Sequence, residues 1–353
     1  MFKIKSPVRI DIPFVVGIGI LVLTSVVVLR PIAPSLFPFY FFYFILGIII
    51  FVSFLQIDFE AISYFDKFFY VGSIVLLLIT LIIGNATRGA VRWIPIGPLT
   101  IQSAEFARPL LLIFFAKFLT EKEVNTKRFI QALFLLALPV FLILIQPSLG
   151  MTLLTVVGFL GVAMSSVASK KFLLVGAGVL LLALPLIWFL LATYQKERVL
   201  TFLDPSLDPA GKGYNSLQSM ITVGSGKLLG RGLGKGVQTQ LSFLPERHTD
   251  FIFASVAEEL GLIGAIFLLV VIFSLLLRLT TFMQNAQSPA ARAYLSGLFL
   301  TLFVQTLIHV GMNMGLLPIT GVPLPLVSSG GSSFLATMMG LSIALRARKQ
   351  IVP

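Results

Sequence analysis

The sequence contains no cysteine and only two histidines, His248 and His309, in 353 residues. The lack of cysteine excludes disulfides, thiolate nucleophiles and metal sites with cysteine ligands. Two histidines are too few for a zinc site built from clustered histidines. Charged residues are also scarce, at 11% of the chain, where soluble domains have about 25%. These absences exclude thiol chemistry and argue against a soluble protein.

Apolar residues fill the chain instead, with 57% hydrophobic residues and a mean hydropathy of +1.01. A membrane-spanning helix needs about 20 consecutive apolar residues. We therefore predict an all-α, polytopic membrane protein that forms one domain over 1–353, with about ten transmembrane helices. The expected spans are 12–29, 37–55, 68–84, 105–119, 129–146, 150–168, 172–193, 251–279, 293–315 and 330–346.

The net charge of +12 is explained mainly by basic residues in alternate short connections, so it does not indicate nucleic-acid binding. Such a bias marks the cytoplasmic side of a membrane. Both termini are accordingly predicted to be cytoplasmic, and the first span to be retained because no small-residue cleavage site follows it. The basic residues concerned are Lys3, Lys5, Arg9, Lys117, Lys122, Lys127, Arg128, Lys170, Lys171, Arg278, Arg292, Arg346, Arg348 and Lys349.

Longer connections lie on the other side, roughly at 85–104, 194–250 and 316–329. The large extracytoplasmic loop of about 194–250 separates the seventh and eighth predicted helices. Its glycine-rich part has neither the GxGxxG nor the P-loop spacing, which argues against a nucleotide site. Lys227, Arg231 and Lys235 recur there every four residues. If this segment is helical, they share one face and suit a pyrophosphate group; anionic lipid headgroups are the alternative.

The most polar stretch of the chain is 246–250, directly before a long apolar run. Asp250 is either the N-cap of that helix or a general base or cation ligand at the membrane surface. Arg247 could keep Asp250 ionised or compensate phosphate charge. Glu258 and Glu259 follow within the apolar run, where charge is costly enough that function is the first hypothesis.

Two further pairs are candidates for substrate contacts. Arg92 and Trp93 are either interfacial belt residues or line the entrance for a lipid-linked substrate. Glu105 and Arg108 have the i, i+3 spacing of a helical ion pair. That pair either joins helices structurally or faces an aqueous cavity.

The last long connection ends in a cluster of serines and glycines at 328–333. Serine capping and glycine flexibility would explain the cluster structurally. Close approach of Ser328 and Ser332 to a substrate is the alternative. The break at 146–150 reads Gln-Pro-Ser-Leu-Gly and is typical of a tight turn.

Several segments resemble the SEDS family (shape, elongation, division and sporulation), and the resemblance extends over essentially the whole chain. They are 243–253 (Phe-Leu-Pro-Glu-Arg-His-Thr-Asp-Phe-Ile-Phe), 257–261 (Ala-Glu-Glu-Leu-Gly), 89–93, 205–219 and 313–325. The resemblance implies a ten-helix peptidoglycan glycosyltransferase that polymerises lipid II on the outer face of the cytoplasmic membrane. It assigns the family's essential aspartate to Asp250, and its other functional positions to Trp93, Glu105 and Arg108.

The run Leu-Pro-Ile-Thr-Gly-Val-Pro-Leu-Pro at 317–325 is similar to the rod-shape branch of the family. That similarity implies a role in cell elongation, with a class B penicillin-binding protein and the elongation machinery as partners and no nucleic acid. A division or sporulation role with the same chemistry is the alternative within the family. A lipid II flippase and a scaffold without catalysis are alternatives of other classes.

The chain departs from the family pattern at four positions. Ser103 stands where the family has proline, Arg108 where it has lysine, and Ser148 where it has aspartate. Ser329 stands where an aromatic is usual. Arg108 keeps the charge but not the compact geometry of lysine, and any role of the turn at Ser148 is in doubt.

The expected mechanism is an inverting transfer in which Asp250 deprotonates the acceptor hydroxyl. The diphosphate leaving group must be neutralised, and a divalent cation, Mg²⁺ or Mn²⁺, held partly by Asp250 could contribute. No nucleotide is expected. The candidate substrate-binding residues are Arg92, Trp93, Glu105, Arg108, Lys227, Arg231, Arg247, His248, Ser328 and Ser332.

Overall fold

A computed structural model describes residues 10–87, 90–96, 99–166, 193–203 and 212–349, with single positions at 174, 178, 188 and 189. Nine of the predicted spans correspond to helices in it. The predicted span 172–193 lies almost wholly outside the described residues. The nine helices are α1 (Ile12–Ile32), α2 (Phe37–Leu55), α4 (Asp66–Ile83), α5 (Ser103–Thr120), α6 (Thr126–Ile145), α7 (Leu149–Ser166), α12 (Ile252–Gln284), α13 (Pro289–Asn313) and α14 (Gly331–Ala347).

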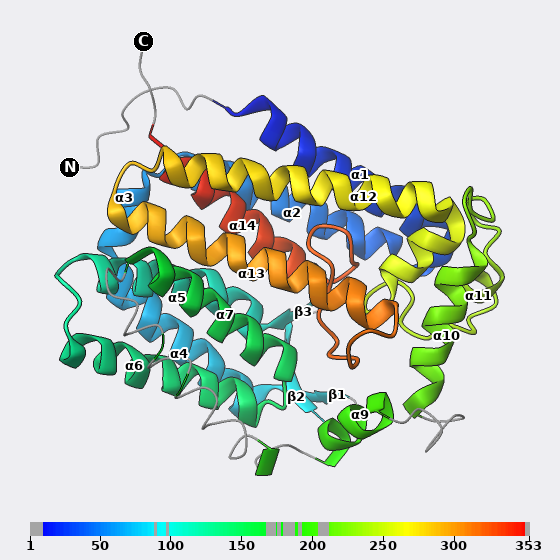
Figure 1. Ribbon diagram of the computed structural model, residues 1–353, viewed down its shortest axis with the longest axis horizontal. Helices are drawn as coiled ribbons and strands as arrows, with labels where there is room; N and C mark the ends of the chain where they lie inside the picture. Colours follow the sequence, from blue (N-terminus) through cyan, green and yellow to red (C-terminus); the bar gives the residue numbers. More distant parts are fainter. Residues whose placement is uncertain are drawn as a thin grey trace.

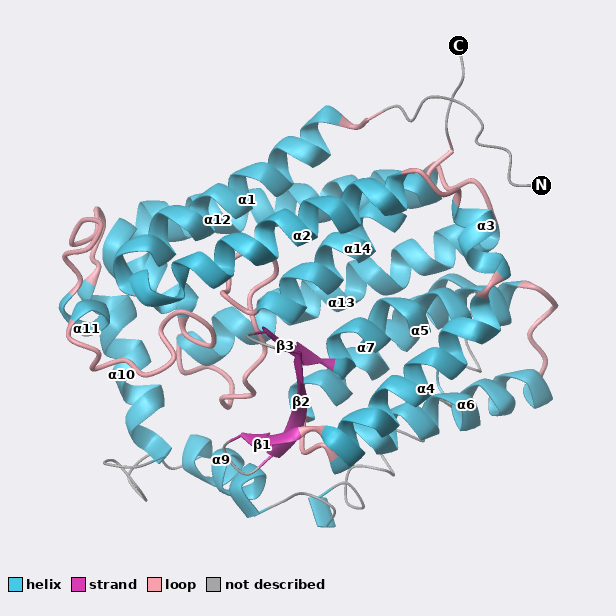
Figure 2. Ribbon diagram, turned by 180° about the vertical axis from the view of Figure 1, so that it is seen from behind, coloured by secondary structure: helices cyan, strands magenta, loops and turns pink. Residues whose placement is uncertain are grey.

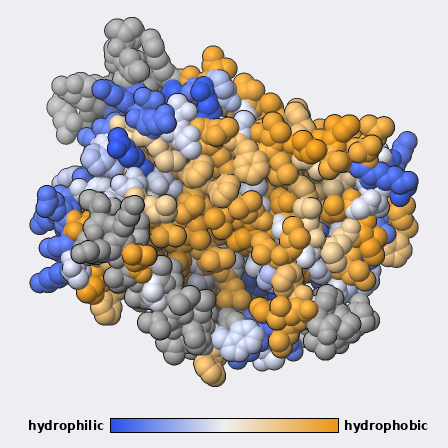
Figure 3. Space-filling view, viewed as in Figure 1, coloured by the Kyte–Doolittle hydropathy of each residue, from blue (hydrophilic) through white to orange (hydrophobic). Residues whose placement is uncertain are grey.

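The described part of the chain contains seven helices that are long and apolar enough to cross a membrane. Two other predicted spans, α5 and α14, fall short of that measure, since α5 carries three charged residues and α14 has 17 residues. Both are buried along most of their length. Apolar side chains cover the middle of the molecular face in Figure 3, and hydrophilic ones gather toward its edges. The chain is therefore a multi-pass membrane protein.

The start of α1 and the end of α14 lie at one end of the bundle, here called the terminal end, and the strands and the helices α9, α10 and α11 lie at the other (Figure 1). At the terminal end, Asp11 accepts hydrogen bonds from Arg278 (3.3 Å) and Arg348 (3.0 Å). Burial lowers the pKa of Arg348, and the Asp11 carboxylate offsets part of this effect. These ion pairs join the start of α1 to α12, through Arg278, and to the residue that follows α14, through Arg348.

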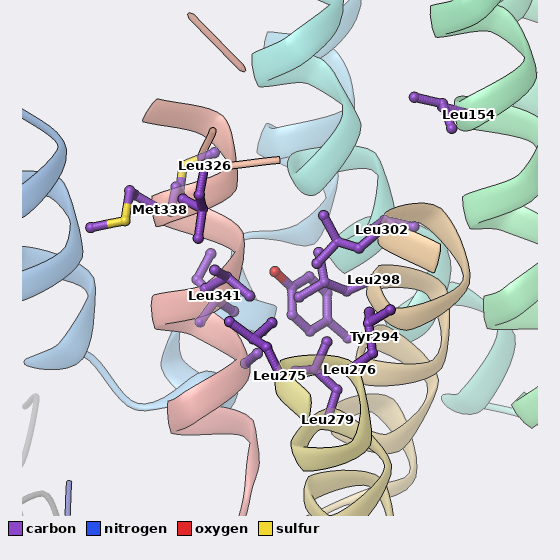
Figure 4. Close-up of a cluster of buried hydrophobic side chains, with 14 of the residues drawn as sticks. Leu154, Leu275, Leu276, Leu279, Tyr294, Leu298, Leu302, Leu326, Met338 and Leu341 are labelled. Atoms are coloured by element: carbon purple, nitrogen blue, oxygen red, sulfur yellow. The ribbon is translucent and has the colours of Figure 1, made fainter. Parts of the chain in front are cut away.

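Helix α13 lies inside the bundle, packed against α5, α7, α12 and α14. Its close contact with α7 depends on glycine: a Cβ at Gly161 would lie 2.7 Å from the carbonyl oxygen of Ser296. Small residues allow such close approach between membrane helices. Toward the terminal end, leucines of α12 and α13 and the ring of Tyr294 form an apolar cluster with α14 (Figure 4).

The long connections at the other end contain short strands and helices. Residues 85–102 form an antiparallel sheet of β1 (Asn85–Thr87), β2 (Ala90–Ile96) and β3 (Leu99–Gln102), in which Trp93 is opposite Gln102 (Figure 2). The predicted loop of 194–250 contains α9 (Thr193–Leu203), α10 (Lys212–Ser225) and α11 (Val237–Gln240). Short elements at other connections are η1 (Pro34–Leu36) and α3 (Phe59–Tyr64).

Helix α12 is interrupted at Gly261, which has φ 71° and ψ −169°. The interruption leaves backbone carbonyl and N–H groups of α12 without helical partners, and the glycine-rich segment that follows α10 forms hydrogen bonds with them. The backbone N–H groups of Arg231 and Gly232 donate to the carbonyls of Glu258 (2.8 Å) and Glu259 (3.0 Å). On the other side of the break, Leu262 donates to the carbonyl of Lys227 (2.9 Å). The glycine-rich segment is thus held against the side of α12.

This arrangement contradicts the conditional prediction that Lys227, Arg231 and Lys235 share a helical face. Lys227 has φ 49°, and Gly230, Gly232 and Gly234 also have positive φ, a region that helices of L-residues do not use. The three cations are exposed on a chain of turns. The Glu258 and Glu259 side chains, which the sequence marked as functional, bind α11, the short helix that follows this segment. Glu258 accepts from the backbone N–H groups of Gln238 (2.9 Å) and Thr239 (3.0 Å), and Glu259 from the Gln240 side chain (3.2 Å).

Replacing Gly261 by alanine is expected to destabilise the protein by about 1–3 kcal/mol, because this φ/ψ combination is almost restricted to glycine. A Cβ there would also lie 2.3 Å from the backbone nitrogen of Gly230. The melting temperature in detergent measures the effect. Gly72→Ala, at an open helical position where a Cβ meets nothing within 4 Å, is the control and should not lower it. Equal melting temperatures for the two variants would contradict the prediction.

Candidate functional site

The site is built where two loops meet at the end of the bundle opposite the termini. The hydroxyl of Ser328 donates to the carbonyl of Thr249 (2.8 Å). The backbone N–H and the hydroxyl of Ser329 both donate to the carbonyl of His248, at 2.9 and 2.8 Å. The loop before α12 and the loop before α14 therefore form one unit. Ser329, which departs from the family pattern, contributes two of these bonds.

Asp250 lies in this unit and is partly buried. The interpretation of Asp250 as the N-cap of the following helix is wrong: the N-cap of α12 is Phe251, without a side-chain capping bond. The first-turn N–H of Ala254 is instead bound by the Asn313 side chain (3.0 Å). A Cβ on Gly321 would lie 3.5 Å from Asp250 Oδ2. The carboxylate therefore faces the glycine of the neighbouring loop.

Arg247 and Glu246 help to shape the turn that carries Asp250. The Arg247 side chain donates through Nε to the carbonyl of Ile32 at the end of α1 (3.2 Å). The backbone carbonyl of Arg247 accepts a hydrogen bond from the hydroxyl of Ser255 (2.9 Å). Glu246, with φ 49°, accepts from the Thr249 hydroxyl (3.0 Å). Arg247 thus anchors the turn to α1, and its contact with phosphate stays a prediction.

Arg92 lies on β2, facing a small pocket of ≈ 60 Å³. Arg198 of α9 lines the same pocket, and its Nη1 donates to the carbonyl of Ile319 (3.2 Å). Thr320, next to the glycine that faces Asp250, also lines it. The structure therefore brings Arg92 close to the Asp250 unit. It adds Arg198, which no spacing in the sequence indicated because α9 and β2 are about 100 residues apart in the chain.

Glu105 and Arg108 form the predicted ion pair, with 2.9 Å between Oε2 and Nη2 and exposed fractions of 1% and 5%. Glu105 Oε1 and Arg108 Nη1 are both buried without a hydrogen-bond partner. Arg108 and Thr337 line a small void between α5, α13 and α14. The pair is thus inside the bundle rather than on the surface that carries Asp250.

The two serines predicted to approach a substrate have hydroxyls that already bind backbone groups. Ser332 donates to the carbonyl of Thr100 (3.1 Å) and accepts from the N–H of Gln102 (3.0 Å). Ser328 binds Thr249 as described above, and accepts from the N–H of Leu324 (2.8 Å). Both are buried, with exposed fractions of 3% for Ser328 and 1% for Ser332. In this conformation they connect loops.

Among the described residues, no group of three or more His, Asp or Glu side chains gathers to hold a metal ion. Asp250 offers one carboxylate. A single protein carboxylate suits Mg²⁺, which often binds through one or two carboxylates together with substrate phosphates and water. Asp250 therefore offers one ligand for a cation, and the described residues do not form a complete cage around it.

Comparison with known proteins identifies the family. The chain matches the FtsW/RodA/SpoVE family model, described as cell cycle protein, over residues 10–351. It is 39% identical over 305 residues to peptidoglycan glycosyltransferase MrdB of Escherichia coli K12, covering 85% of this chain and 82% of that protein.

Solved structures agree in fold over nearly the full length. One chain belongs to a peptidoglycan synthase complex that coordinates polymerization and crosslinking; it has a TM-score of 0.82 and 32% identity, covering 96% of this chain and 97% of that chain. The structure of rod shape determining protein RodA of Thermus thermophilus has a TM-score of 0.73 and 26% identity, and the match covers 97% of this chain and 99% of that chain. With a family match over almost the whole sequence and relatives this similar, the chain belongs to the FtsW/RodA/SpoVE family of cell cycle proteins.

Proposed function

We propose that this protein is a peptidoglycan glycosyltransferase that polymerises lipid II into glycan strands, with Asp250 as its catalytic carboxylate. Family membership and the 39% identity to a peptidoglycan glycosyltransferase support the activity. The observation that carries the assignment to Asp250 is its setting: the carboxylate faces Gly321 at the junction of two loops held together by hydrogen bonds. Such preorganisation is what a catalytic group requires.

The proposed reaction transfers a glycan chain between two lipid-linked molecules. Asp250 accepts the proton of the acceptor GlcNAc 4-hydroxyl as its oxygen bonds to the anomeric carbon of the donor. The bond from that carbon to the lipid diphosphate breaks at the same time, and the diphosphate leaves with the electron pair. Attack from the face opposite the leaving group inverts the configuration.

The developing charge on the diphosphate needs cationic groups nearby. Arg92 lies beside the Asp250 unit, in the pocket that Arg198 and Thr320 share, and is our leading candidate. We further propose Lys227, Arg231 and His248 as substrate contacts; Arg108 is paired with Glu105 inside the bundle and is not among them. A divalent cation bound by Asp250 and the diphosphate would supply additional charge neutralisation when present.

We propose that the Asp250 end of the bundle is extracytoplasmic and that both termini are cytoplasmic. The start of α1 and the end of α14 lie at the end of the bundle opposite this unit (Figure 1). The basic connections, which include Lys117, Arg278 and Arg346, indicate the cytoplasmic side. On this topology, the site meets lipid II in the outer leaflet.

A class B penicillin-binding protein is the proposed partner, and cell elongation the proposed role. Support comes from the similar chain in a peptidoglycan synthase complex and from the resemblance in fold to a rod shape determining protein. A division or sporulation role would use the same chemistry and is separated from elongation by the partner that is bound.

A lipid II transporter is the competing function, and the composition of α13 argues against it. Polar residues line the buried side of this helix toward Asp250, namely Thr301, Gln305, His309 and Asn313. Toward the terminal end, α13 contributes Tyr294 and Leu298 to the apolar cluster in Figure 4. The buried polar groups of α13 therefore reach from the Asp250 end to Thr301, at the middle of the helix, and not into the half toward the terminal end. A transporter would need a polar path that continues through that half.

The test is glycan polymerisation from purified lipid II, with and without the class B partner and with EDTA. We expect polymer from the wild-type protein, and loss of polymer with EDTA if a divalent cation takes part. In a parallel assay, vesicles containing labelled lipid II measure translocation. Translocation without polymer under every condition would overturn the proposal in favour of the transporter.

A further inference from the structure

The buried polar face of α13 contacts both loops of the site. Three residues spaced one turn apart, Gln305, His309 and Asn313, have exposed fractions of 0% each. Each side chain binds a backbone group of a loop at the site, and Asn313 also binds the first turn of α12. Buried polar groups are costly unless they are bonded, so their position on this face needs an explanation.

Asn313 is the most fully bonded of the three. Its Nδ2 donates to the carbonyls of Asp250 (3.0 Å) and His309 (2.7 Å). Its Oδ1 accepts from the N–H of Ala254 (3.0 Å). One amide therefore holds the backbone of Asp250 and closes the first turn of α12. The N-cap residue of α12 is Phe251, whose side chain makes no capping bond, and Asn313 binds the first turn in its place.

His309 and Gln305 hold the opposite loop. His309 Nδ1 lies 2.7 Å from the carbonyl of Val322, and since a carbonyl only accepts, Nδ1 carries the hydrogen. Gln305 Nε2 donates to the carbonyl of Pro323 (2.8 Å). These bonds fix the backbone next to Gly321, the residue that Asp250 Oδ2 faces. One face of one helix thus binds the backbone on both sides of the carboxylate.

We propose that Asn313, with His309 and Gln305, is the positioning element of the catalytic carboxylate: it sets Asp250 against the 321–323 loop through the main chain, without touching substrate. This inference rests on the proposed function of Asp250. A displacement of about 1 Å at a reacting group can cost about a hundredfold in rate. A positioning residue should therefore affect kcat, because substrate contacts that determine KM stay in place.

The test measures initial rates of lipid II polymerisation against lipid II concentration for the full-length protein with its partner. In Asn313→Ala we expect kcat to fall at least about tenfold and KM to change less than about twofold. The matched control is Ser219→Ala. It removes the hydrogen bond from the Ser219 hydroxyl to the Asn313 carbonyl (2.9 Å) and leaves the side-chain amide in place, so kcat should stay near the wild-type value.

Melting temperatures of all variants separate positioning from folding. If Asn313→Ala does not fold, His309→Phe replaces it as the test, because it keeps a ring of similar size and removes only the bond to Val322; kcat should again fall with KM nearly unchanged. A kcat no lower than that of Ser219→Ala, or a loss that resides in KM, would overturn the inference. Asp250→Ala is measured in parallel: polymer from that variant would refute the proposed function itself.

Discussion

Asp250→Ala and Asp250→Asn are each expected to lower lipid II polymerisation by at least about a hundredfold, the usual contribution of a general base. Asparagine keeps the shape of the side chain and removes its charge. Both variants should fold, because the first turn of α12 is capped by Asn313 and the Asp250 carboxylate is not its capping group. The rate of glycan formation from purified lipid II measures the first effect, and the melting temperature in detergent the second.

The matched control for Asp250 is Glu123→Ala. Glu123 is an exposed carboxylate in the connection between α5 and α6, and its removal changes the net charge by the same amount. Its polymerisation rate should stay close to that of the wild-type protein, since substitutions at such surface positions usually change stability by less than about 0.5 kcal/mol. Substantial polymer from well-folded Asp250→Asn would contradict the assignment of Asp250 as the catalytic base.

Arg108→Ala is expected to destabilise the protein by about 3–5 kcal/mol, the usual cost of leaving one charge of a buried pair unpaired. Glu105 would remain with an exposed fraction of 1% after losing its partner at 2.9 Å. Arg108→Lys keeps the charge and should cost less, although a lysine cannot reproduce the planar guanidinium. The melting temperature in detergent measures the effect: we expect it to be highest for the wild-type protein, lower for Arg108→Lys and lowest for Arg108→Ala.

A double variant separates the charge effect from the loss of packing. Glu105→Leu combined with Arg108→Met fills similar volume without charge, and such replacements are often neutral or stabilising. We expect it to melt above Arg108→Ala. If Arg108→Ala melts like the wild-type protein, the pair does not stabilise the bundle, and a role toward an aqueous cavity becomes the better explanation.

The membrane helices were predictable from apolar runs, because a bilayer requires about 20 apolar residues in each span whatever the rest of the chain does. The ion pair of Glu105 and Arg108 was predictable from its i, i+3 spacing, which a helix converts into contact. Asp250 was marked by its polar surroundings at the start of an apolar run. Each of these conclusions depends on residues close together in the chain.

Local pattern was misleading where glycine changes the backbone. With their four-residue spacing, the side chains of Lys227, Arg231 and Lys235 would share a face only if the segment were helical. The positive φ angles of the intervening glycines instead form turns, which bind the interrupted part of α12 at Gly261. The strands of 85–102 were also missed, since two of the three are only 3 and 4 residues long and are stable only when paired with each other.

The partners of Asp250 could be found only in the tertiary structure. Asn313 binds its carbonyl across 63 residues of sequence, and Ser328 binds Thr249 across 79. Hydrogen bonds over such separations leave no periodic signal, because the folding of the whole bundle brings the two loops together. Composition and spacing thus determine a membrane protein with a polar site at one end. The packing of α13 decides which buried groups hold Asp250, since only packing sets the distance between segments remote in the chain.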